Sequence, residues 1–510
     1  MQPTQLALYA LAGTILFFFI KPVFNALRSP LRHVPGPLAA RFTRLWYLLR
    51  VRNGQFHQEN ITLHHKYNSN VIRYAPNSYS ISEPEAIKTI YSLYQGFPKS
   101  DWYAAWSPTR VRSLFTIQDN KVHGGLRRKF QSTYSMSSMV SYEAFTDQCT
   151  AILRRRMTEH AESGKPMDMA WWFQCFAVDT VAMITSSKRF GGLDAGEDIG
   201  GFTKALHGGL AYASQVGIYN EWHLPIVEFM AQLKNWGLSK GTPRMYLGDF
   251  IASTVGARRK LRESGEKVDL EEQDENAPKD MLDKFLDAND VDPSHFSQGD
   301  IIMGLSGNVI AGSDTTAATL TALLHNLIQN PQILSRLRDE IADASAIDKL
   351  SSPVTFKEAQ EHLPYLQAVI QETLRVHPAV GLPLERIVPA GGVQICGHYF
   401  PEGSVVGVNA WVLHYDTDVY GPDAADFSPE RWLYSSEEQL ARMRRSWLPF
   451  GLGSRTCIGK NISLLEMSKL VPELLKAFDF EAVRGEGWEV KNQWFVIPKS
   501  LNVTVKQRSQ

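Results

Sequence analysis

The stretch of sequence that decides the fold is Phe450-Gly451-Leu452-Gly453-Ser454-Arg455-Thr456-Cys457-Ile458-Gly459. Its two closely spaced glycines, Gly451 and Gly453, allow a tight backbone path beneath a flat ligand. A helical pattern begins just after Cys457, and the backbone N–H groups at the start of a helix favour negative charge on a nearby sulfur. The stretch therefore predicts a loop that presents a cysteine thiolate to a planar group.

Three side chains of this loop suit the chemistry of a bound haem. A thiolate ligand pushes electron density toward oxygen, which a haem iron needs in order to cleave the O–O bond. We expect Cys457 to supply that thiolate, Arg455 to bind a haem propionate, and Phe450 to pack beside the sulfur and exclude water. The other possibility for a single cysteine is that it is a small buried hydrophobic residue. We expect that role for the three remaining cysteines, which are Cys149, Cys175 and Cys396.

The same ten residues resemble the cysteine signature of the cytochrome P-450 superfamily, Phe-x-x-Gly-x-Arg-x-Cys-x-Gly, and they fill every fixed position. The resemblance implies a mainly α fold with small β-sheets, haem b (iron protoporphyrin IX) as cofactor, and Cys457 as the axial ligand of the iron. Residues 382–386 and 448–469 also resemble fungal microsomal enzymes of the pisatin-demethylase-like group, which often act in secondary metabolism.

A second motif concerns the support of this loop. Glu372-Thr373-Leu374-Arg375 lies in a helical pattern, and residues three apart on a helix face the same side. Taken alone, such a pair is most often exposed and contributes little to stability. The resemblance implies more: Glu372, Arg375 and the downstream Arg431 form a structural triad of guanidinium–carboxylate contacts that holds the cysteine loop in place.

A long apolar helical pattern over residues 297–329 contains Ala311-Gly312-Ser313-Asp314-Thr315-Thr316. At 1.5 Å per residue this helix would be roughly 48 Å long. A glycine inside a helix costs about 1 kcal/mol relative to alanine, so we expect Gly312 to leave room for a ligand. A threonine hydroxyl can also bond back to an earlier carbonyl and open the helix locally. The resemblance places Asp314 and Thr315 over the iron as the catalytic pair that relays protons to bound oxygen.

The two carboxylates of haem need cationic partners. The resemblance implies four candidates for this role, namely His123, Arg127, Arg386 and Arg455. The alternative for each of them is an ordinary surface charge. The substrate pocket is expected to be formed by four segments: the one before His123, the long helix, the turn after Pro378, and the C-terminal region. These segments offer an apolar and aromatic lining that fits a lipophilic small molecule. The candidates, each of which could instead be a core residue, are Trp102, Tyr103, Trp106, Ile310, Ala311, Val380, Leu382, Phe495 and Val496.

The N-terminal region predicts a membrane anchor over residues 1–24. Residues 6–20 carry no charge, and extending the run to residue 24 gives a helix just long enough to span a ~30 Å hydrocarbon core. Basic residues follow the run at Lys21, Arg28 and Arg32, and none precedes it. This pattern predicts a single-pass transmembrane helix in the endoplasmic reticulum membrane, with the catalytic body cytoplasmic. A cleaved signal peptide and an amphipathic surface helix are the alternatives.

The rest of the chain is predicted to form a proline-rich hinge over residues 25–40 and one haem-binding monooxygenase domain over residues 41–510. We expect short strands at residues 71–74, 79–81, 393–395 and 405–408. Lys plus Arg and Asp plus Glu each total 53, so no basic excess indicates a nucleic-acid partner. Four cysteines do not make a disulfide framework.

The resemblance predicts a monooxygenase that inserts one atom of O2 into a lipophilic substrate. The chain after Cys457 is too short for a flavin or nicotinamide domain, so we expect electrons to come from NADPH through a separate flavoprotein reductase. Nearby basic residues could meet an acidic partner; they are Arg442, Arg444, Arg445, Lys460 and Lys469. The alternatives are a haem–thiolate isomerase or dehydratase that uses no O2, a non-catalytic haem-binding protein, and a purely structural membrane protein.

Overall fold

The computed structural model describes residues 20–94, 96–107, 113–235, 244–264, 279–485 and 487–508, together with Gln5 and Gly13. Most of these residues are helical. The helices of the first half are α2 (Leu45–Asn53), α3 (Phe56–Tyr67), α4 (Pro84–Ile90), α5 (Asn120–Phe130), α6 (Met136–Val140), α7 (Glu143–Ser163), α8 (Met169–Ser186), α9 (Gly192–Ala195), α10 (Phe202–Val216), α11 (His223–Asn235) and α12 (Arg244–Ser264).

The second half begins with α13 and contains the long helix. Its helices are α13 (Met281–Val291), α14 (Gln298–Gln329), α15 (Pro331–Ala346), α16 (Phe356–His362), α17 (Pro364–Val376), α18 (Ala410–His414), α19 (Thr417–Tyr420), α20 (Arg431–Tyr434), α21 (Glu437–Ser446) and α22 (Lys460–Ala477). Short 3-10 helices include η2 (Asp101–Trp106) and η5 (Gly453–Arg455). The predicted mainly α fold with small β-sheets is confirmed.

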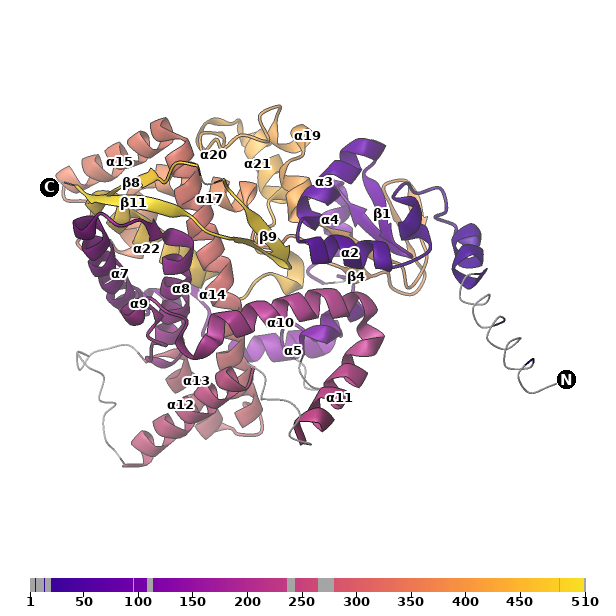
Figure 1. The fold of residues 1–510 in the computed structure, drawn as a ribbon, viewed down its shortest axis with the longest axis horizontal. Coiled ribbons are helices and arrows are strands. Elements are labelled where there is room, and N and C mark those ends of the chain that lie inside the picture. The colour runs from indigo at the N-terminus through magenta and orange to yellow at the C-terminus, as the bar shows by residue number, and fades with distance from the viewer. Residues whose placement is uncertain are drawn as a thin grey trace.

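The largest sheet has the strand order β1-β2-β7-β4. β1 (Val71–Ala75) and β2 (Ser78–Ile81) form an antiparallel hairpin, and β2 pairs in parallel with β7 (Val405–Val408). β7 pairs in turn with β4 (Arg386–Ile387), which fixes the backbone of Arg386 at the sheet edge. Figure 1 shows this sheet with α2, α3 and α4 on one side of the molecule, apart from the bundle of long helices.

Three smaller sheets complete the β structure. β3 (Met167–Asp168), β11 (Asn502–Gln507) and β8 (Phe478–Ala482) form one, while β9 (Val490–Gln493) pairs with β10 (Phe495–Pro498). β5 (Val393–Ile395) pairs with β6 (His398–Phe400). The four strands predicted from the sequence therefore correspond to β1, β2, β5 and β7.

Helix α14 runs through the centre of the molecule (Figure 1) and contacts α8, α12, α13, α15, α17, α22 and β10. Its start is a capping box in which the Ser297 side chain accepts from the N–H of Asp300 and the Asp300 carboxylate accepts from the N–H of Ser297. Pro331 begins the next helix. The predicted long helix is confirmed, and its central position lets it carry side chains to the middle of the protein.

The three cysteines outside the 450–459 loop sit in apolar surroundings, as expected. Cys149 and Cys175 are buried in the main core, and burial raises the pKa of both thiols. Cys396 is half-buried in the turn between β5 and β6, where burial raises its pKa to about 12. A raised pKa keeps a thiol protonated and unreactive.

The N-terminal anchor prediction falls mostly outside the described residues, which omit 6–12 and 14–19. No helix in the described ranges is long and apolar enough to cross a membrane. Residues 20–28 are helical and expose Ile20, Phe24 and Leu27. Farther along, the N–H of Arg73 donates to the carbonyl of Pro35, so the segment predicted as a hinge touches strand β1.

Candidate active site

The loop that presents Cys457 is held by its own backbone and by two glycines. The N–H of Cys457 donates to the carbonyl of Phe450 at 2.8 Å. Gly451 and Gly453 have φ angles of 66° and 68°, in the left-handed region. A Cβ on Gly453 would lie 1.8 Å from the carbonyl oxygen of Tyr91, so only glycine fits there. The tight turn expected from the sequence is therefore present.

The sulfur of Cys457 is available to a ligand. The side chain keeps accessible surface although the surrounding protein is dense enough to raise the pKa of the thiol. The N–H groups of Gly459 and Lys460 and the guanidinium of Arg127 act against this rise. An accessible sulfur can bind a metal, and coordination to a metal deprotonates a thiol outright.

Four cations gather on the same side of the loop. Arg455 donates to the carbonyls of Ile117 and Gln118 at 2.5 Å and 2.8 Å, and Arg127 donates to the carbonyl of Thr456 at 2.8 Å. Lys99 forms a β-bridge with Arg386, which brings a fourth positive charge into the group. These side chains repel one another. Together with burial, that repulsion lowers the pKa of Arg455 to about 10 and holds the pKa of Lys99 well below its usual value.

His123 lies in the midst of these cations and is 4% exposed. Burial first, and then the charges of Arg455, Lys99, Arg127 and Arg386, lower the pKa of His123 to about 3, so the ring is neutral at physiological pH.

Carboxylates that could neutralise this cationic cluster are engaged elsewhere. Glu385, the neighbour of Arg386, accepts from the hydroxyls of Ser100 at 2.6 Å and Tyr74 at 2.9 Å. Among the described residues, no carboxylate lies within ion-pair distance of the four cations. A buried group of cations without anions is costly unless a ligand supplies the opposite charge. The cluster therefore fits the two propionates of a haem. Lys99 was not predicted from the sequence, because nothing in its local pattern indicates a place in this cationic cluster.

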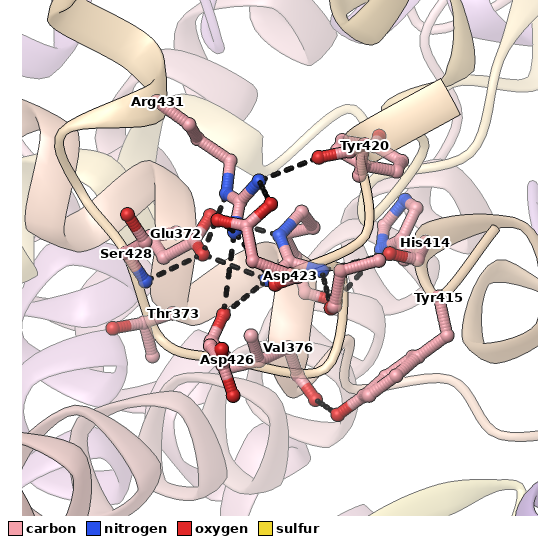
Figure 2. Close-up of polar contacts among 12 residues, drawn as sticks. Glu372, Thr373, Val376, His414, Tyr415, Tyr420, Asp423, Asp426, Ser428 and Arg431 are labelled. Atoms are coloured by element: carbon pink, nitrogen blue, oxygen red, sulfur yellow. Dashed lines mark hydrogen bonds and ion pairs between the residues drawn. The ribbon is translucent and has the colours of Figure 1, made fainter. Parts of the chain in front are cut away.

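The three residues of the predicted triad are in contact, and Figure 2 shows two of them, Glu372 and Arg431, facing each other. Arg375 binds both oxygens of Glu372, and Nε of Arg431 donates to Oε1 of Glu372 at 3.0 Å. The indole N–H of Trp432 and the backbone N–H of Ser428 complete the set of donors, at 2.8 Å and 2.9 Å. Glu372 therefore accepts from five donors although it is fully buried. The prediction that these residues meet holds, whereas the donors Trp432 and Ser428 were not anticipated.

The two arginines of this network also bind main-chain carbonyls of residues 414–426, which run from the last residue of α18 through α19 to the segment before α20. Figure 2 shows Arg431 with Tyr420, Asp423 and Asp426. The carbonyls belong to His414, Tyr420, Asp423, Ala424 and Asp426. His414 extends the network toward the cysteine loop, since its ring contacts the carbonyl of Arg375 at 2.9 Å and accepts from the N–H of Leu448 at 3.0 Å. Burial lowers the pKa of His414 to about 3, so the ring stays neutral and keeps an acceptor nitrogen.

Thr315 and Asp314 on helix α14 have different hydrogen-bond partners. The hydroxyl of Thr315 donates to the carbonyl of Ala311 at 2.8 Å, the back-bond that was expected, but the helix continues without a break. Asp314 is fully buried, and its Oδ1 accepts from Nε2 of Gln174 on α8 at 2.7 Å. The Asp314 carboxylate is thus bound by neighbouring helices rather than held beside the Thr315 hydroxyl.

Gly312 does not have the role that the sequence suggested. A Cβ at this position would lie 2.8 Å from Cγ2 of Val181 on α8. The glycine therefore permits close packing of α14 on α8, and the expectation that it leaves room for a ligand is wrong. A glycine that lets two helices approach and one that leaves space for a ligand have the same signature in the sequence.

Comparison with known proteins agrees with this geometry. The cytochrome P-450 family model matches residues 35–505. The chain belongs to the cytochrome P-450 family. A cytochrome P-450 monooxygenase of Aspergillus terreus is 35% identical over 471 residues, covering 90% of this chain and 92% of the relative. A pisatin demethylase of Fusarium vanettenii is 34% identical over 490 residues, covering 96% and 90%. The P-450 monooxygenase mpaDE of Penicillium roqueforti is 34% identical over 492 residues, and this chain spans 56% of its length.

Within this cytochrome P-450, the proposed pocket residues separate into two groups. Trp102, Tyr103, Leu382 and Phe495 are buried in one apolar cluster, and Trp106 and Val380 pack against it half-buried. By contrast, Ile310 is 38% exposed and Ala311 is exposed, although both lie on the central helix α14. Exposed apolar residues at the centre of the fold are the ones best placed to meet a ligand. Val380 and Phe495 are joined by an isolated β-bridge, so the turn after Pro378 and the C-terminal region do meet.

The basic residues around the cysteine loop of the P-450 comprise an exposed group and one buried lysine. Arg442, Arg444, Arg445 and Lys460 are exposed. Lys469 is 1% exposed and pairs with Glu143 at 2.8 Å and Asp147 at 3.1 Å, so it cannot serve a partner surface.

Proposed function

We propose that this cytochrome P-450 is a haem–thiolate monooxygenase that inserts one atom of O2 into a lipophilic small molecule, by hydroxylation or a related oxidation. The observation that carries the proposal is the accessible Cys457 beside a buried to half-buried cationic cluster that has no carboxylate partner among the described residues. Haem b, when bound, supplies the oxygen-activating chemistry. Its electrons come from NADPH through a separate flavoprotein reductase.

We assign each of these residues its own role. Cys457 binds the iron, and Arg127, Arg386, Arg455, Lys99 and neutral His123 bind the propionates. Phe450 is half-buried and its ring lies 6.1 Å from that of Trp447, which helps to exclude water from the sulfur. Thr315 supplies a hydroxyl on helix α14, and Asp314 passes protons toward it. Positioned proton transfer of this kind contributes roughly 10²- to 10⁴-fold to a rate.

The substrate class follows from the apolar surroundings. Ile310 and Ala311 on α14, with the edge of the cluster around Trp106, Val380 and Leu382, offer few charges to a ligand. A lipophilic molecule is therefore favoured. Because the relatives are fungal, and one is named as a demethylase, we place the enzyme in fungal secondary metabolism and consider methyl ethers suitable probes.

The cellular arrangement rests on the N-terminal sequence. We infer a single-pass helix over residues 1–24 in the endoplasmic reticulum membrane, with the catalytic body on the cytoplasmic side. The exposed apolar face of helix 20–28 and the basic residues Lys21, Arg28 and Arg32 support this arrangement. The reductase then approaches the exposed basic residues near the cysteine loop, among them Arg444 and Lys460.

The test is spectroscopic first and catalytic second. The full chain, co-expressed with a fungal NADPH-dependent reductase, should give the thiolate-type Soret band of the reduced carbon monoxide complex, and Cys457→Ala and Cys457→His should abolish it. Turnover of lipophilic aryl methyl ethers such as 4-nitroanisole under ¹⁸O2 should require NADPH and place label in the released formaldehyde or in a hydroxylated product.

Each alternative has its own outcome. Turnover that needs neither NADPH nor O2 would identify an isomerase or dehydratase. A haem spectrum without turnover of a broad lipophilic panel would favour a non-catalytic haem protein. Absence of bound haem from the full-length protein would leave only a structural role.

A further inference from the structure

The buried Asp314 has a neighbour that connects it to the protein surface. Nε2 of His207, on helix α10, lies 3.4 Å from Oδ1 of Asp314. The His207 side chain is 38% exposed, whereas that of Asp314 is 0% exposed. Nε2 of His207 is itself buried and makes no hydrogen bond to the described residues in this ring orientation, so the ring turns this nitrogen inward while its other edge reaches solvent. One side chain thus spans the distance from solvent to the buried carboxylate.

The two oxygens of Asp314 have unequal surroundings. Oδ1 accepts from Gln174 at 2.7 Å and faces His207, while Oδ2 is buried and has no hydrogen-bond partner. A buried carboxylate oxygen without a partner is costly and rare in a folded protein. Gln174 can donate a hydrogen bond but cannot take up a proton, so it fixes the carboxylate without competing for the proton. The free oxygen is the one from which a proton can move onward.

The charges around His207 favour its protonated form. Burial lowers the pKa of His207, but the neighbouring charges of Asp314 and Asp198 raise it, and Lys491 on β9 acts against them. The net effect is a pKa above the usual histidine value. Asp314 therefore faces a histidine whose protonated, proton-donating form is favoured, as a proton donor requires.

We propose that His207 is the solvent-side proton donor to Asp314, so that protons enter the active site between α10, α8 and α14. This inference rests on the proposed monooxygenase function and extends it. The proton leaves Nε2 of His207 and binds the Asp314 carboxylate, which makes the ring neutral and the carboxylate a neutral acid. Asp314 passes the proton toward Thr315 and is a carboxylate again. His207 then turns its ring outward and takes a new proton from water.

The experiment uses the full-length holoenzyme with three variants and one control. His207→Gln keeps a hydrogen-bond donor but cannot titrate, His207→Lys keeps a cation whose pKa is far higher, and Asp314→Asn removes the acceptor. His295→Gln is the control, because His295 is an exposed histidine on the loop before α14. Two quantities are measured from pH 6 to 9: the titration of ¹³C-labelled histidine rings by NMR, and the rate of NADPH-dependent 4-nitrophenol release from 4-nitroanisole.

The NMR readout does not depend on activity. The wild-type spectrum should contain one histidine that titrates above the usual range; this signal should vanish in His207→Gln and shift to lower pH in Asp314→Asn. In the wild-type enzyme the rate should fall as pH rises through that same pKa, since the imidazolium donor is lost. His207→Gln should be about tenfold slower and lack this pH dependence, and His207→Lys should restore part of the rate and move its fall to higher pH.

The failures are distinguishable. If His207→Gln retains the wild-type rate and pH profile while Asp314→Asn is slow, protons reach Asp314 by another route and the inference is wrong. A titration that does not respond to Asp314→Asn would also overturn it. If the wild-type enzyme shows no NADPH-dependent oxidation at all, the proposed function itself fails.

Discussion

Arg375 binds Glu372 through two parallel hydrogen bonds, from Nε to Oε2 at 2.8 Å and from Nη2 to Oε1 at 2.7 Å, and neither side chain is exposed. Such bidentate pairs are the strongest of the charge-assisted contacts. Their burial has an asymmetric effect: the intact pair is tolerated, but removal of one partner leaves the other charge in a medium that cannot solvate it.

Replacing Glu372 with alanine should therefore prevent the protein from holding haem. Arg375 would lose its carboxylate and Arg431 would keep only that of Asp423, at a cost of roughly 3–5 kcal/mol, a large part of a stability of about 5–15 kcal/mol. We expect little haem-loaded protein and a clearly lower melting temperature, measured by absorbance and by calorimetry. Glu361→Ala is the matched control, since Glu361 pairs with Lys357 at 3.9 Å and is 54% exposed. Normal haem content in Glu372→Ala would show that the network does not support the site.

Replacing Thr315 with alanine should leave NADPH consumption running while product formation falls. The backbone of α14 does not depend on this hydroxyl, so haem binding should persist. Without it, proton delivery becomes disordered, and NADPH should be consumed while hydrogen peroxide replaces product. We expect product per NADPH to fall about tenfold or more. Thr319→Ala is the control, because Thr319 makes the same back-bond one turn later, to the carbonyl of Thr315 at 2.9 Å. Equal coupling ratios in the two variants would contradict the role of Thr315.

Glu466 on α22 makes the stability depend on pH. It is fully buried, neither of its carboxylate oxygens has a hydrogen-bond partner, and burial raises its pKa to about 8, with the Thr316 hydroxyl acting in the opposite direction. In the unfolded chain a glutamate ionises near pH 4.3. The folded state therefore binds more protons, and the contribution of Glu466 to stability is lost as pH rises from that value toward 8.

Glu466→Gln should consequently melt with a weaker dependence on pH between pH 5 and 8, and should be more stable than the wild-type protein at the upper end of this range. The wild-type and variant melting temperatures across this range give the comparison. Glu438→Gln, at an exposed position, should leave the pH dependence unchanged. Parallel curves for Glu466→Gln and the wild-type protein would show that Glu466 is ionised in the folded state.

Deleting residues 1–24 should weaken membrane association without altering the haem site. The deletion removes the predicted span together with the exposed Ile20 and Phe24 of helix 20–28. The body should then lose its expected lipid contact. Membrane pelleting in high salt and the carbon monoxide spectrum are the two measurements. If the truncated protein still pellets completely, other segments bind lipid.

Local signals in the sequence were reliable where local geometry decides the structure. The glycines beside Cys457, the cap at Ser297 and the i, i+3 pair of Glu372 and Arg375 all depend on residues close in the chain, and each is found as expected. The family resemblance added Arg431, which is distant in sequence from Glu372.

Long-range partners could not be predicted in the same way. Gln174 reaches Asp314 because α8 packs against α14, His207 reaches it from the separate helix α10, and Lys99 joins the cationic cluster through its bridge to Arg386. Lys469 resembles any surface lysine in sequence, and its burial follows from the carboxylates of α7. In each case the tertiary packing of separate elements, and not the periodicity of one element, determines the contact.

The arginines of the Glu372 network bind five main-chain carbonyls of residues 414–426, and Arg431 also binds the Asp423 carboxylate at 3.0 Å. Arg375 and Arg431 bind carbonyl oxygens that every amino acid possesses, in the way that a neighbouring strand would bind them. The path of this segment is thus specified largely through its backbone, while the side chains of His414 and Asp423 add contacts of their own. Its exposed positions can accept many substitutions, provided that the backbone can still follow the same course.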